Sequence, residues 1–275
     1  FTPRYVIDMC VKMLNPKPYE SMIDPASGSC GFPIHTCFYV WERLYKARGL
    51  EPSHLFTAES KIAECTDYVK EKIFGIDFDD KSVRVSKMLN LIAGDGHTNV
   101  LYLNSIDYEH WEEWMKNDEW EDIYFEGWKR LKKLRAERDA NRDFNFDILM
   151  ANPPFAGDIK ESRILARYEL GKNANGKAQS KVGRDILFIE RNLNMLKDGG
   201  RMAIVLPQGR FNNSSDKYIR EFIADKARIL AVIGLHGNVF KPHTGTKTSV
   251  LILQKWGGVD ENGGKNGDKN GEELC

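Results

Sequence analysis

Short apolar segments alternate with segments of helical periodicity along most of this chain. Apolar residues spaced three and four apart predict helices, and short apolar runs bounded by turn residues predict strands. The predicted strands are Ser21–Asp24, Ile73–Asp77, Val100–Leu103, Phe146–Ala151, Arg201–Leu206, Ile229–Leu235 and Thr248–Gln254. The predicted helices are Arg4–Leu14, Phe32–Ala47, Lys81–Ala93, Arg184–Leu196 and Ser215–Asp225.

This alternation predicts an α/β fold. Strands separated by helices are joined by right-handed crossovers, which build a mostly parallel sheet with helices on both faces. The last two predicted strands differ, because only Gly237–Thr246 joins them and leaves no room for a helix. We therefore expect a seven-stranded, mostly parallel sheet with an antiparallel hairpin at one edge.

Three stretches interrupt the pattern and define the expected organisation. Residues 107–143 contain four tryptophans and change from acidic to basic, which predicts a charged helical insertion with one solvated face, or alternatively a docking or DNA-facing arm. Residues 156–183 are rich in Gly, Asn, Lys and Ser, which predicts a mobile loop acting as a lid or a DNA contact. Residues 257–275 form an expected flexible tail, so one domain spans residues 1–256.

The sequence Asn152-Pro153-Pro154-Phe155 follows the fourth predicted strand and is the most informative motif. Each proline fixes its own φ and pushes the preceding residue towards extended geometry. The result is a stiff turn that presents an amide side chain, backbone carbonyls and an aromatic ring. Carbonyl oxygens accept the hydrogens of an exocyclic amino group while the aromatic ring stacks on its base, so the motif suits methylation of an amino group. A plain Asn turn at the end of a strand is the alternative.

Three other strand ends carry candidate ligand-binding residues. The first strand runs into Asp24-Pro25-Ala26-Ser27-Gly28-Ser29-Cys30-Gly31, where glycines permit close approach of the backbone and a helix N-terminus favours an anionic group. The second strand ends at Asp77, which could accept the hydroxyls of a ribose, with Phe78 packing on an adenine ring. We assign Asp79 to the cap of the next helix. After the third strand, Asn104 could hydrogen-bond an adenine edge.

Charge and composition narrow the function. The 40 basic and 40 acidic residues balance, so DNA contact must be local or supplied by a partner. Five cysteines without metal-ligand spacing favour a reducing cytoplasm and predict neither a metal site nor a disulfide framework. The sequence contains no signal peptide and no membrane-spanning apolar run, so no membrane contact is expected. Because it starts at Phe1 rather than Met, we expect the chain to be part of a longer protein.

Taken in order, these motifs resemble the catalytic core of amino-group DNA methyltransferases, specifically the modification subunit of type I restriction–modification systems. The match runs from the opening Phe1-Thr2-Pro3-Arg4 to about Trp256, and includes the loop and strand at Phe240–Thr248. It implies a Rossmann-like fold that uses S-adenosylmethionine. The implied cofactor-binding residues are Phe1, Thr2, Pro3, Asp24, Ala26, Gly28, Ser29, Gly31, Asp77, Phe78, Asn104, Ser105 and Ile106.

The resemblance also implies a mechanism and partners. Asn152, Pro153, Pro154 and Phe155 would be the catalytic residues, acting on the N6 atom of an adenine flipped out of double-stranded DNA. A DNA-specificity subunit would choose the site, with a restriction subunit where the system cleaves DNA. The loop after the motif would contact DNA phosphates through Lys160, Arg163, Arg167, Lys172, Lys177 and Lys181.

Two departures from the family pattern and two alternative functions remain. Cys30 replaces a usual glycine, so its backbone must avoid positive φ or accept strain, with Gly31 available to absorb the turn. The insertion at residues 107–143 is unusually long for the family.

Methylation of a protein glutamine at N5 would also suit the turn at Asn152–Phe155. A scaffold subunit that binds the cofactor without catalysis is the other alternative.

Overall fold

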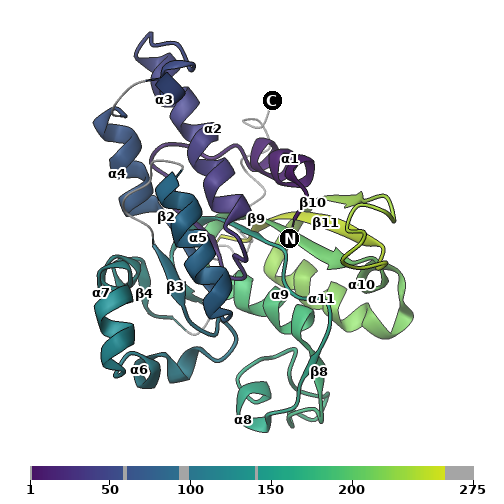
Figure 1. Cartoon of the computed structure of the whole chain (residues 1–275). Helices are drawn as coiled ribbons and strands as arrows, with labels where there is room; N and C mark the ends of the chain where they lie inside the picture. The colour runs from purple at the N-terminus through teal and green to yellow at the C-terminus, as the bar shows by residue number, and fades with distance from the viewer. Residues whose placement is uncertain (1, 58–60, 93–98, 140–141, 258–275) are drawn as a thin grey trace. The chain divides into compact units, whose positions relative to one another are not determined.

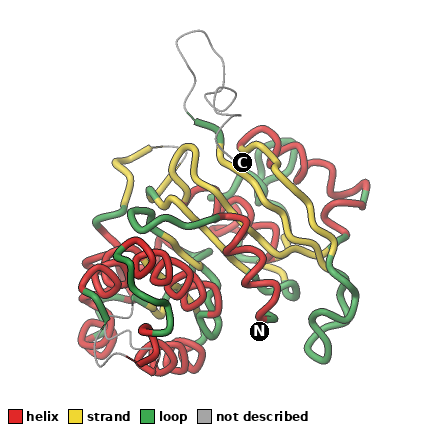
Figure 2. The backbone as a smooth tube through the Cα atoms, turned by 90° about the horizontal axis from the view of Figure 1, so that it is seen from above, coloured by secondary structure: helices red, strands yellow, loops and turns green. Residues whose placement is uncertain are grey.

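The computed structural model describes residues 2–57, 61–92, 99–139 and 142–257. Seven strands of this part form one sheet in the order β10-β11-β9-β6-β1-β2-β3. Figure 1 labels β2, β3, β9, β10 and β11 among them, and Figure 2 draws the strands in yellow. They are β1 Met22–Asp24, β2 Ile73–Asp77, β3 Val100–Tyr102, β6 Phe146–Ala151, β9 Leu196–Pro207, β10 Ala227–Gly234 and β11 Thr248–Lys255.

The pairing of these strands confirms the predicted sheet. β1 pairs with β2 and β2 with β3 in parallel. β11 pairs antiparallel with both β9 and β10, so the last two strands form a hairpin with β10 at the edge. β9 is longer than predicted, because it begins at Leu196 and continues through a glycine pair in which Gly199 has φ +75°.

The chain divides into two compact units. Unit 1 comprises Phe1–Arg135 and Met150–Asn152, and unit 2 comprises Ala136–Leu149 and Pro153–Cys275. The boundary therefore falls inside β6 and again between Asn152 and Pro153. The division cuts an element that reads in the sequence as one apolar strand, and the assignment of residues 1–256 to one domain stays a prediction.

Unit 1 contains the helices that pack on β1, β2 and β3. Helices α2 and α5 contact these strands, and α1 packs on α2 (Figure 1). α1 is amphipathic and buries an apolar stripe with helical spacing, which stabilises it on α2. The helices are α1 Arg4–Leu14, α2 Gly31–Ala47, α3 His54–Thr57, α4 Ala63–Lys72, α5 Asp80–Ile92, η1 Tyr108–His110, α6 Trp111–Trp114 and α7 Asp118–Lys132.

Helix α4 has no counterpart among the predicted elements. Its buried residues are Cys65, Tyr68 and Val69, which follow the three- and four-residue spacing of a helix face. The rest of the helix is charged or polar, so the apolar stripe is too narrow to stand out in the sequence.

Unit 2 is built around a buried helix and the antiparallel strands. In α9 (Arg184–Met195), ten of the twelve residues are buried, including Arg191, which pairs with Asp143. Lys255 of β11 donates to the carbonyls of Leu193 (2.8 Å) and Leu196 (2.9 Å), which ties α9 to the sheet. The other elements are β5 Arg142–Phe144, β7 Asp158–Ile159, α8 Ser162–Leu165, β8 Val182–Gly183, α10 Gly209–Asn212, η2 Ser214–Asp216 and α11 Lys217–Lys226.

The insertion is helical only in part. η1, α6 and α7 match the predicted helical character, but β4 (Arg135–Asp139) and β5 then form a two-stranded sheet. Trp111, Trp120 and Trp128 are buried and α7 packs on β3, whereas Trp114 is 37 % exposed. The tryptophans are therefore mainly packing residues, and α7 has the expected solvated face.

The segment after the Asn-Pro-Pro-Phe motif has more local structure than a mobile loop predicts. β7 and β8 pair antiparallel, and Lys172 bridges to Ala178. Glu190 of α9 accepts hydrogen bonds from the backbone N–H groups of Glu169 and Leu170, each at 2.8 Å. Its Gly and Asn residues thus lie among local hydrogen bonds, and the assignment of residues 156–183 to a mobile lid or DNA contact stays a prediction.

Two chemical properties complete the description of the fold. Cys10, Cys30, Cys37 and Cys65 are buried free thiols. None of the helices in the described ranges is long and apolar enough to cross a membrane. The predicted tail at residues 257–275 lies almost entirely outside the described residues.

Candidate active site

The glycine loop after β1 is held by two side chains from other elements. The Gly28 N–H donates to Asp77 Oδ2 at 2.7 Å, and Ser86 Oγ donates to the Gly28 carbonyl at 2.6 Å. Gly28 has φ +50°, a conformation that favours glycine. Ser86 was not among the predicted site residues, and its distance of 58 positions along the chain gave no signal for this contact.

Cys30 has a positive φ and therefore accepts backbone strain, which was one of the two possibilities that the sequence left open. Its φ is +59°, and Gly31 does not absorb the turn because it is the first residue of α2. A left-handed non-glycine residue costs roughly 1–2 kcal/mol. A Cβ at Gly31 would lie 2.6 Å from Ile7 Cδ1, so a larger residue there would require the end of the Ile7 side chain to move. Burial raises the pKa of the Cys30 thiol to about 12, so this side chain is a protonated packing residue.

Asp24 lies beneath the same loop and is 2 % exposed. Its Oδ1 accepts the Ala26 N–H at 3.0 Å. Burial raises the pKa of Asp24 well above its ordinary value, and the charge of Asp77 adds to the effect. Ser29, by contrast, is exposed at the start of α2. Asp24 therefore supports a loop in which Ser27 and Cys30 are buried and Ser29 is exposed.

The two carboxylates after β2 have different tasks. Asp79 Oδ2 accepts hydrogen bonds from the Ser82 N–H (3.0 Å) and hydroxyl (2.6 Å), which confirms it as the cap of α5. Asp77 accepts the backbone N–H groups of Gly28 and Asp79. Asp77 thus joins two strand-end loops, and its assignment to a ribose stays a prediction.

Phe78 forms an aromatic platform between these carboxylates. Its ring stacks on Tyr102 with centroids 5.8 Å apart and planes 9° apart, and it meets the edge of Trp114 at 5.3 Å. The side chain is still 49 % exposed. A ring fixed by neighbours and open to solvent suits stacking of a planar heterocycle.

The turn after β3 reaches the glycine loop. Ser105 Oγ donates to the Pro25 carbonyl at 2.6 Å. Asn104 Oδ1 accepts the Ile106 N–H (3.1 Å), so the amide nitrogen of Asn104 is the atom it would offer an adenine. Trp111 Nε1 donates to the Asn104 carbonyl at 2.7 Å, which anchors the turn to the insertion. The loops after β1, β2 and β3 are therefore connected by hydrogen bonds in unit 1.

Asn152 joins this group through the N-terminal segment. Its Nδ2 donates to Thr2 Oγ1 at 3.0 Å, a contact between residues 150 positions apart. Its Oδ1 is buried and accepts no hydrogen bond from any residue that the structure describes. A buried acceptor without a donor costs about 1–3 kcal/mol, a penalty that an amino group supplied by a substrate would relieve. Pro3 is buried at the start of α1, and Phe1 lies outside the described residues.

The remainder of the motif belongs to unit 2. Pro153 is buried, Pro154 is exposed and Phe155 is partly exposed. The Phe155 ring meets Phe240 edge to face, with centroids 6.1 Å apart and planes at 87°. Phe240 comes from the late loop that the sequence singled out, so this loop supports the aromatic end of the motif.

The six basic residues proposed to contact DNA are all exposed. Of these, Lys181 pairs with Asp158 at 3.3 Å. No group of His, Cys, Asp and Glu side chains within the described ranges could hold a metal ion. The DNA contact stays a prediction for Lys160, Arg163, Arg167, Lys172, Lys177 and Lys181.

Comparison with known proteins gives consistent matches. The model of a family described as N-6 DNA Methylase matches residues 1–262. The type I restriction enzyme EcoEI methylase subunit of Escherichia coli is 25 % identical over 261 residues, covering 93 % of this chain and 42 % of that protein. The EcoKI methylase subunit of E. coli K12 is 23 % identical over 268 residues, covering 97 % and 42 %.

Solved structures show the same fold. The EcoKI M protein superposes with a TM-score of 0.62 at 20 % identity, covering 97 % of this chain and 46 % of that chain. The methyltransferase subunit of a type I restriction-modification system from Streptococcus thermophilus gives a TM-score of 0.59 at 18 % identity, covering 93 % and 44 %. The chain thus spans less than half the length of the relatives it matches.

Proposed function

Because the chain belongs to the N-6 DNA methylase family, we propose that it transfers a methyl group from S-adenosylmethionine to the N6 atom of adenine in DNA. Within the full-length protein it would act as the modification subunit of a restriction–modification complex. The observation that carries this proposal is the buried, unpartnered Oδ1 of Asn152, held in place through Nδ2 by Thr2.

The connected loops of unit 1 fit the proposed cofactor. When bound, S-adenosylmethionine supplies an electrophilic methyl group. Phe78 would stack on its adenine, Asp77 would accept a ribose hydroxyl and Asn104 would hydrogen-bond the adenine edge. The glycine loop would accommodate the methionine end, because Gly28 leaves its backbone uncovered. The proposed cofactor-binding set is completed by Thr2, Pro3, Asp24, Ala26, Ser29, Gly31, Ser105 and Ile106, together with Phe1 outside the described residues.

The residues of the motif would then activate the amine. The lone pair of adenine N6 is conjugated with its ring, so the free base is a poor nucleophile. Asn152 Oδ1 and the Pro153 carbonyl would accept the two N6 hydrogens and draw the nitrogen towards tetrahedral geometry. Phe155 would stack on the flipped base, a contact worth roughly 1–3 kcal/mol. The nitrogen loses its proton after the methyl group has been transferred, so no strong general base is required.

Partner proteins would supply site selection. The chain carries no net charge, so its own attraction for DNA is small. Relatives named as methylase subunits of type I restriction enzymes fit a protein that works beside a specificity subunit. Flipping the target adenine would cost a few kcal/mol, which binding of the assembled complex to DNA would offset.

The test replaces Asn152 in the full-length protein assembled with its specificity partner. Asn152→Ala should abolish transfer of isotope-labelled methyl to DNA while leaving S-adenosylmethionine binding within about twofold, because Asn152 engages the substrate amine. Thr2→Val keeps Asn152 but removes its hydrogen-bond partner, so we expect a lower kcat with a smaller loss. Wild-type turnover in Asn152→Ala would refute the mechanism, and labelling of a glutamine-containing protein instead of DNA would favour the alternative substrate.

A further inference from the structure

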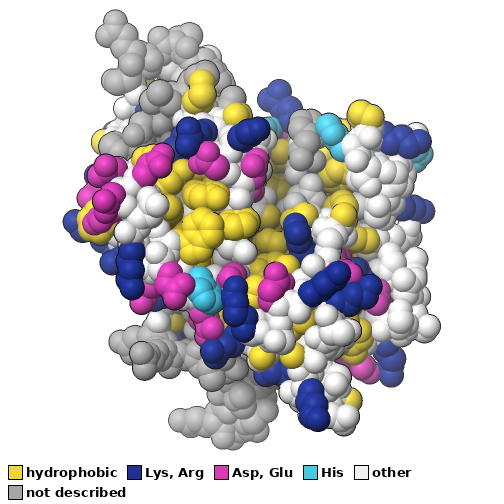
Figure 3. Space-filling view, turned by 60° about the horizontal axis from the view of Figure 1, so that its bottom comes forward, with side chains coloured by type: hydrophobic (Ala, Val, Ile, Leu, Met, Phe, Trp, Pro, Cys, Tyr) yellow, Lys and Arg dark blue, Asp and Glu magenta, His cyan; other side chains and the backbone are white. Residues whose placement is uncertain are grey.

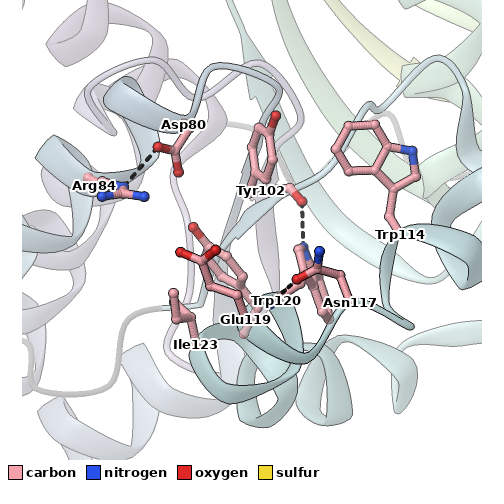
Figure 4. Close-up of a pocket in the computed structure, with 9 residues that line it drawn as sticks. Asp80, Arg84, Tyr102, Trp114, Asn117, Glu119, Trp120 and Ile123 are labelled. Carbon is pink, nitrogen blue, oxygen red and sulfur yellow. Dashed lines mark hydrogen bonds and ion pairs between the residues drawn. The ribbon is translucent and has the colours of Figure 1, made fainter.

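Unit 1 contains a cavity outside the candidate active site, and most of its lining residues come from the insertion at residues 107–143. It is a cavity of about 350 Å³ beside the end of β3 (Figure 4). Four of its lining residues are aromatic: Tyr102, Trp114, Trp120 and Tyr124. The remaining lining residues are Asp80, Arg84, Asn117, Glu119 and Ile123. None of the nine belongs to the proposed cofactor or catalytic set.

The aromatic walls are fixed before any ligand arrives. Trp120 Nε1 donates to the Tyr102 carbonyl at 2.8 Å, and Asn117 Oδ1 accepts the Trp120 N–H at 3.2 Å (Figure 4). Tyr124 packs on Trp120 with ring centroids 5.3 Å apart. Walls held in this way lose little conformational entropy on binding, which favours affinity.

The surface around the cavity is strongly acidic. Residues 107–126 contain nine acidic side chains and one lysine. Within the cavity, Asp80 pairs with Arg84 at 2.8 Å, and Glu119, whose charge also acts on Arg84, forms no close ion pair of its own among the described residues. Asp118, Glu121 and Asp122 are exposed on the same turns of α7. In Figure 3, acidic side chains (magenta) gather beside hydrophobic surface (yellow) at the left of the view.

The acidic surface and the aromatic walls favour a positively charged ligand. Carboxylates on an exposed face repel DNA phosphates, so this half of the insertion is unsuited to the DNA-facing role. Aromatic faces and carboxylates both attract cations, and guanidinium groups stack on aromatic rings more readily than ammonium groups. The chain itself provides one example, since Lys87 Nζ lies 4.0 Å from the centre of the Tyr124 ring.

We propose that this cavity binds an arginine side chain from a basic segment of a partner protein. The guanidinium enters between the aromatic walls and pairs with Glu119, while flanking basic residues of the segment meet the exposed carboxylates of α7. The acidic half of the insertion is then a protein-docking surface. The cavity shares the Tyr102 and Trp114 walls with the Phe78 platform. The tests of this proposal therefore use Glu119 and Ile123, which form no ring contact or hydrogen bond with Phe78 or the catalytic motif within the described residues.

The test measures peptide binding to the full-length protein by fluorescence anisotropy. The probe is a labelled five-residue peptide with a central arginine flanked by lysines, and its twin carries neutral citrulline at the centre. Cation–π contacts of about 0.5–2 kcal/mol correspond to roughly 2- to 30-fold. We expect the arginine peptide to bind more tightly than its twin by a factor in that range. Equal binding of the two peptides would overturn the proposal.

Matched variants separate the cavity from diffuse charge. Glu119→Gln and Glu121→Gln remove the same charge from the same helix turn, but only Glu119 lines the cavity. We expect Glu119→Gln to weaken the arginine peptide several-fold more than Glu121→Gln does. Ile123→Trp should fill the cavity and weaken binding without changing charge. Equal losses for the two glutamine variants, and no loss for Ile123→Trp, would overturn the assignment to the cavity.

Three further experiments distinguish a partner protein from a small molecule, a nucleic acid and a second copy of this chain. Agmatine, which carries a guanidinium without a peptide, should compete only weakly, and competition as strong as that of the peptide would indicate a small-molecule site instead. Displacement of the peptide by duplex DNA of random sequence would indicate a nucleic-acid surface. Sedimentation showing a dimer that Glu119→Gln dissociates would assign the cavity to a second copy of this chain. Any of these three results would overturn the proposal of a partner protein.

Discussion

The two carboxylates after β2 allow a paired prediction, in which only Asp77→Ala strongly weakens cofactor binding and Asp79→Ala changes stability alone. Asp77→Ala removes an acceptor that holds the Gly28 N–H and that we assign to the ribose. A hydrogen bond to a charged group is worth about 1.5–3 kcal/mol, so S-adenosylmethionine should bind about 10- to 150-fold more weakly. Asp77→Asn keeps one acceptor oxygen for Gly28 and should show an intermediate loss.

Asp79→Ala serves as the matched control two residues away. Asp79 Oδ2 accepts the Ser82 N–H and hydroxyl at the start of α5, and loss of a helix cap costs roughly 0.5–2 kcal/mol. The free energy of unfolding should therefore fall by about that amount, whereas the affinity for S-adenosylmethionine should change by no more than about twofold.

Titration calorimetry measures the affinity of each variant for S-adenosylmethionine, and denaturant unfolding of the same preparations measures its free energy of unfolding. The reasoning requires that the larger affinity loss belongs to Asp77→Ala and that Asp79→Ala affects only stability. If Asp79→Ala weakens the cofactor more than Asp77→Ala does, the ribose has been assigned to the wrong carboxylate.

Three more predictions follow from the site. Trp114→Leu removes the edge contact to Phe78, and because aromatic pairs are worth about 0.5–1.5 kcal/mol, binding of S-adenosylmethionine should weaken about 2- to 10-fold. An unchanged affinity in calorimetry would show that Phe78 is not a platform for adenine. Burial raises the pKa of Asp24, so the folded chain keeps a proton that the unfolded chain releases, and the free energy of unfolding falls as pH rises above the ordinary carboxyl range. Asp24→Asn should flatten that fall in urea unfolding between about pH 5 and about pH 8, and parallel curves would contradict a raised pKa. In the assembled complex, neutralising basic residues at positions 156–183 should flatten the salt dependence of DNA binding. The log–log slope should fall by about 0.9 for each phosphate that the protein no longer neutralises. An unchanged slope would place the DNA interface elsewhere, and residues 129–135 are then the next candidate.

The fold and most of the candidate site follow from local sequence. All seven strands were predicted because each is a short apolar run bounded by turn residues, and consecutive strands place their ends at one edge. Asp79 was separable from Asp77 because a cap residue precedes its helix directly. Such features need only a few neighbouring residues to be recognised.

The features that sequence reasoning missed depend on contacts distant along the chain. Thr2 holds Asn152 and Ser86 holds Gly28, and neither pairing has a signature in spacing. Sequence alone left open whether Cys30 avoids positive φ or accepts strain, and the structure gives it φ +59° with Gly31 as the first residue of α2. The aromatic cavity was likewise invisible, because its walls come from α5, β3 and the insertion.

Mass spectrometry of nucleosides from DNA tests the central claim most directly. The full-length protein and its specificity partner would be expressed in cells whose own adenine methyltransferases have been deleted. N6-methyladenine should accumulate with the natural protein and be absent with Asn152→Ala at equal protein level. Absence of N6-methyladenine with the natural protein, or equal amounts with both, would contradict methylation of adenine through Asn152.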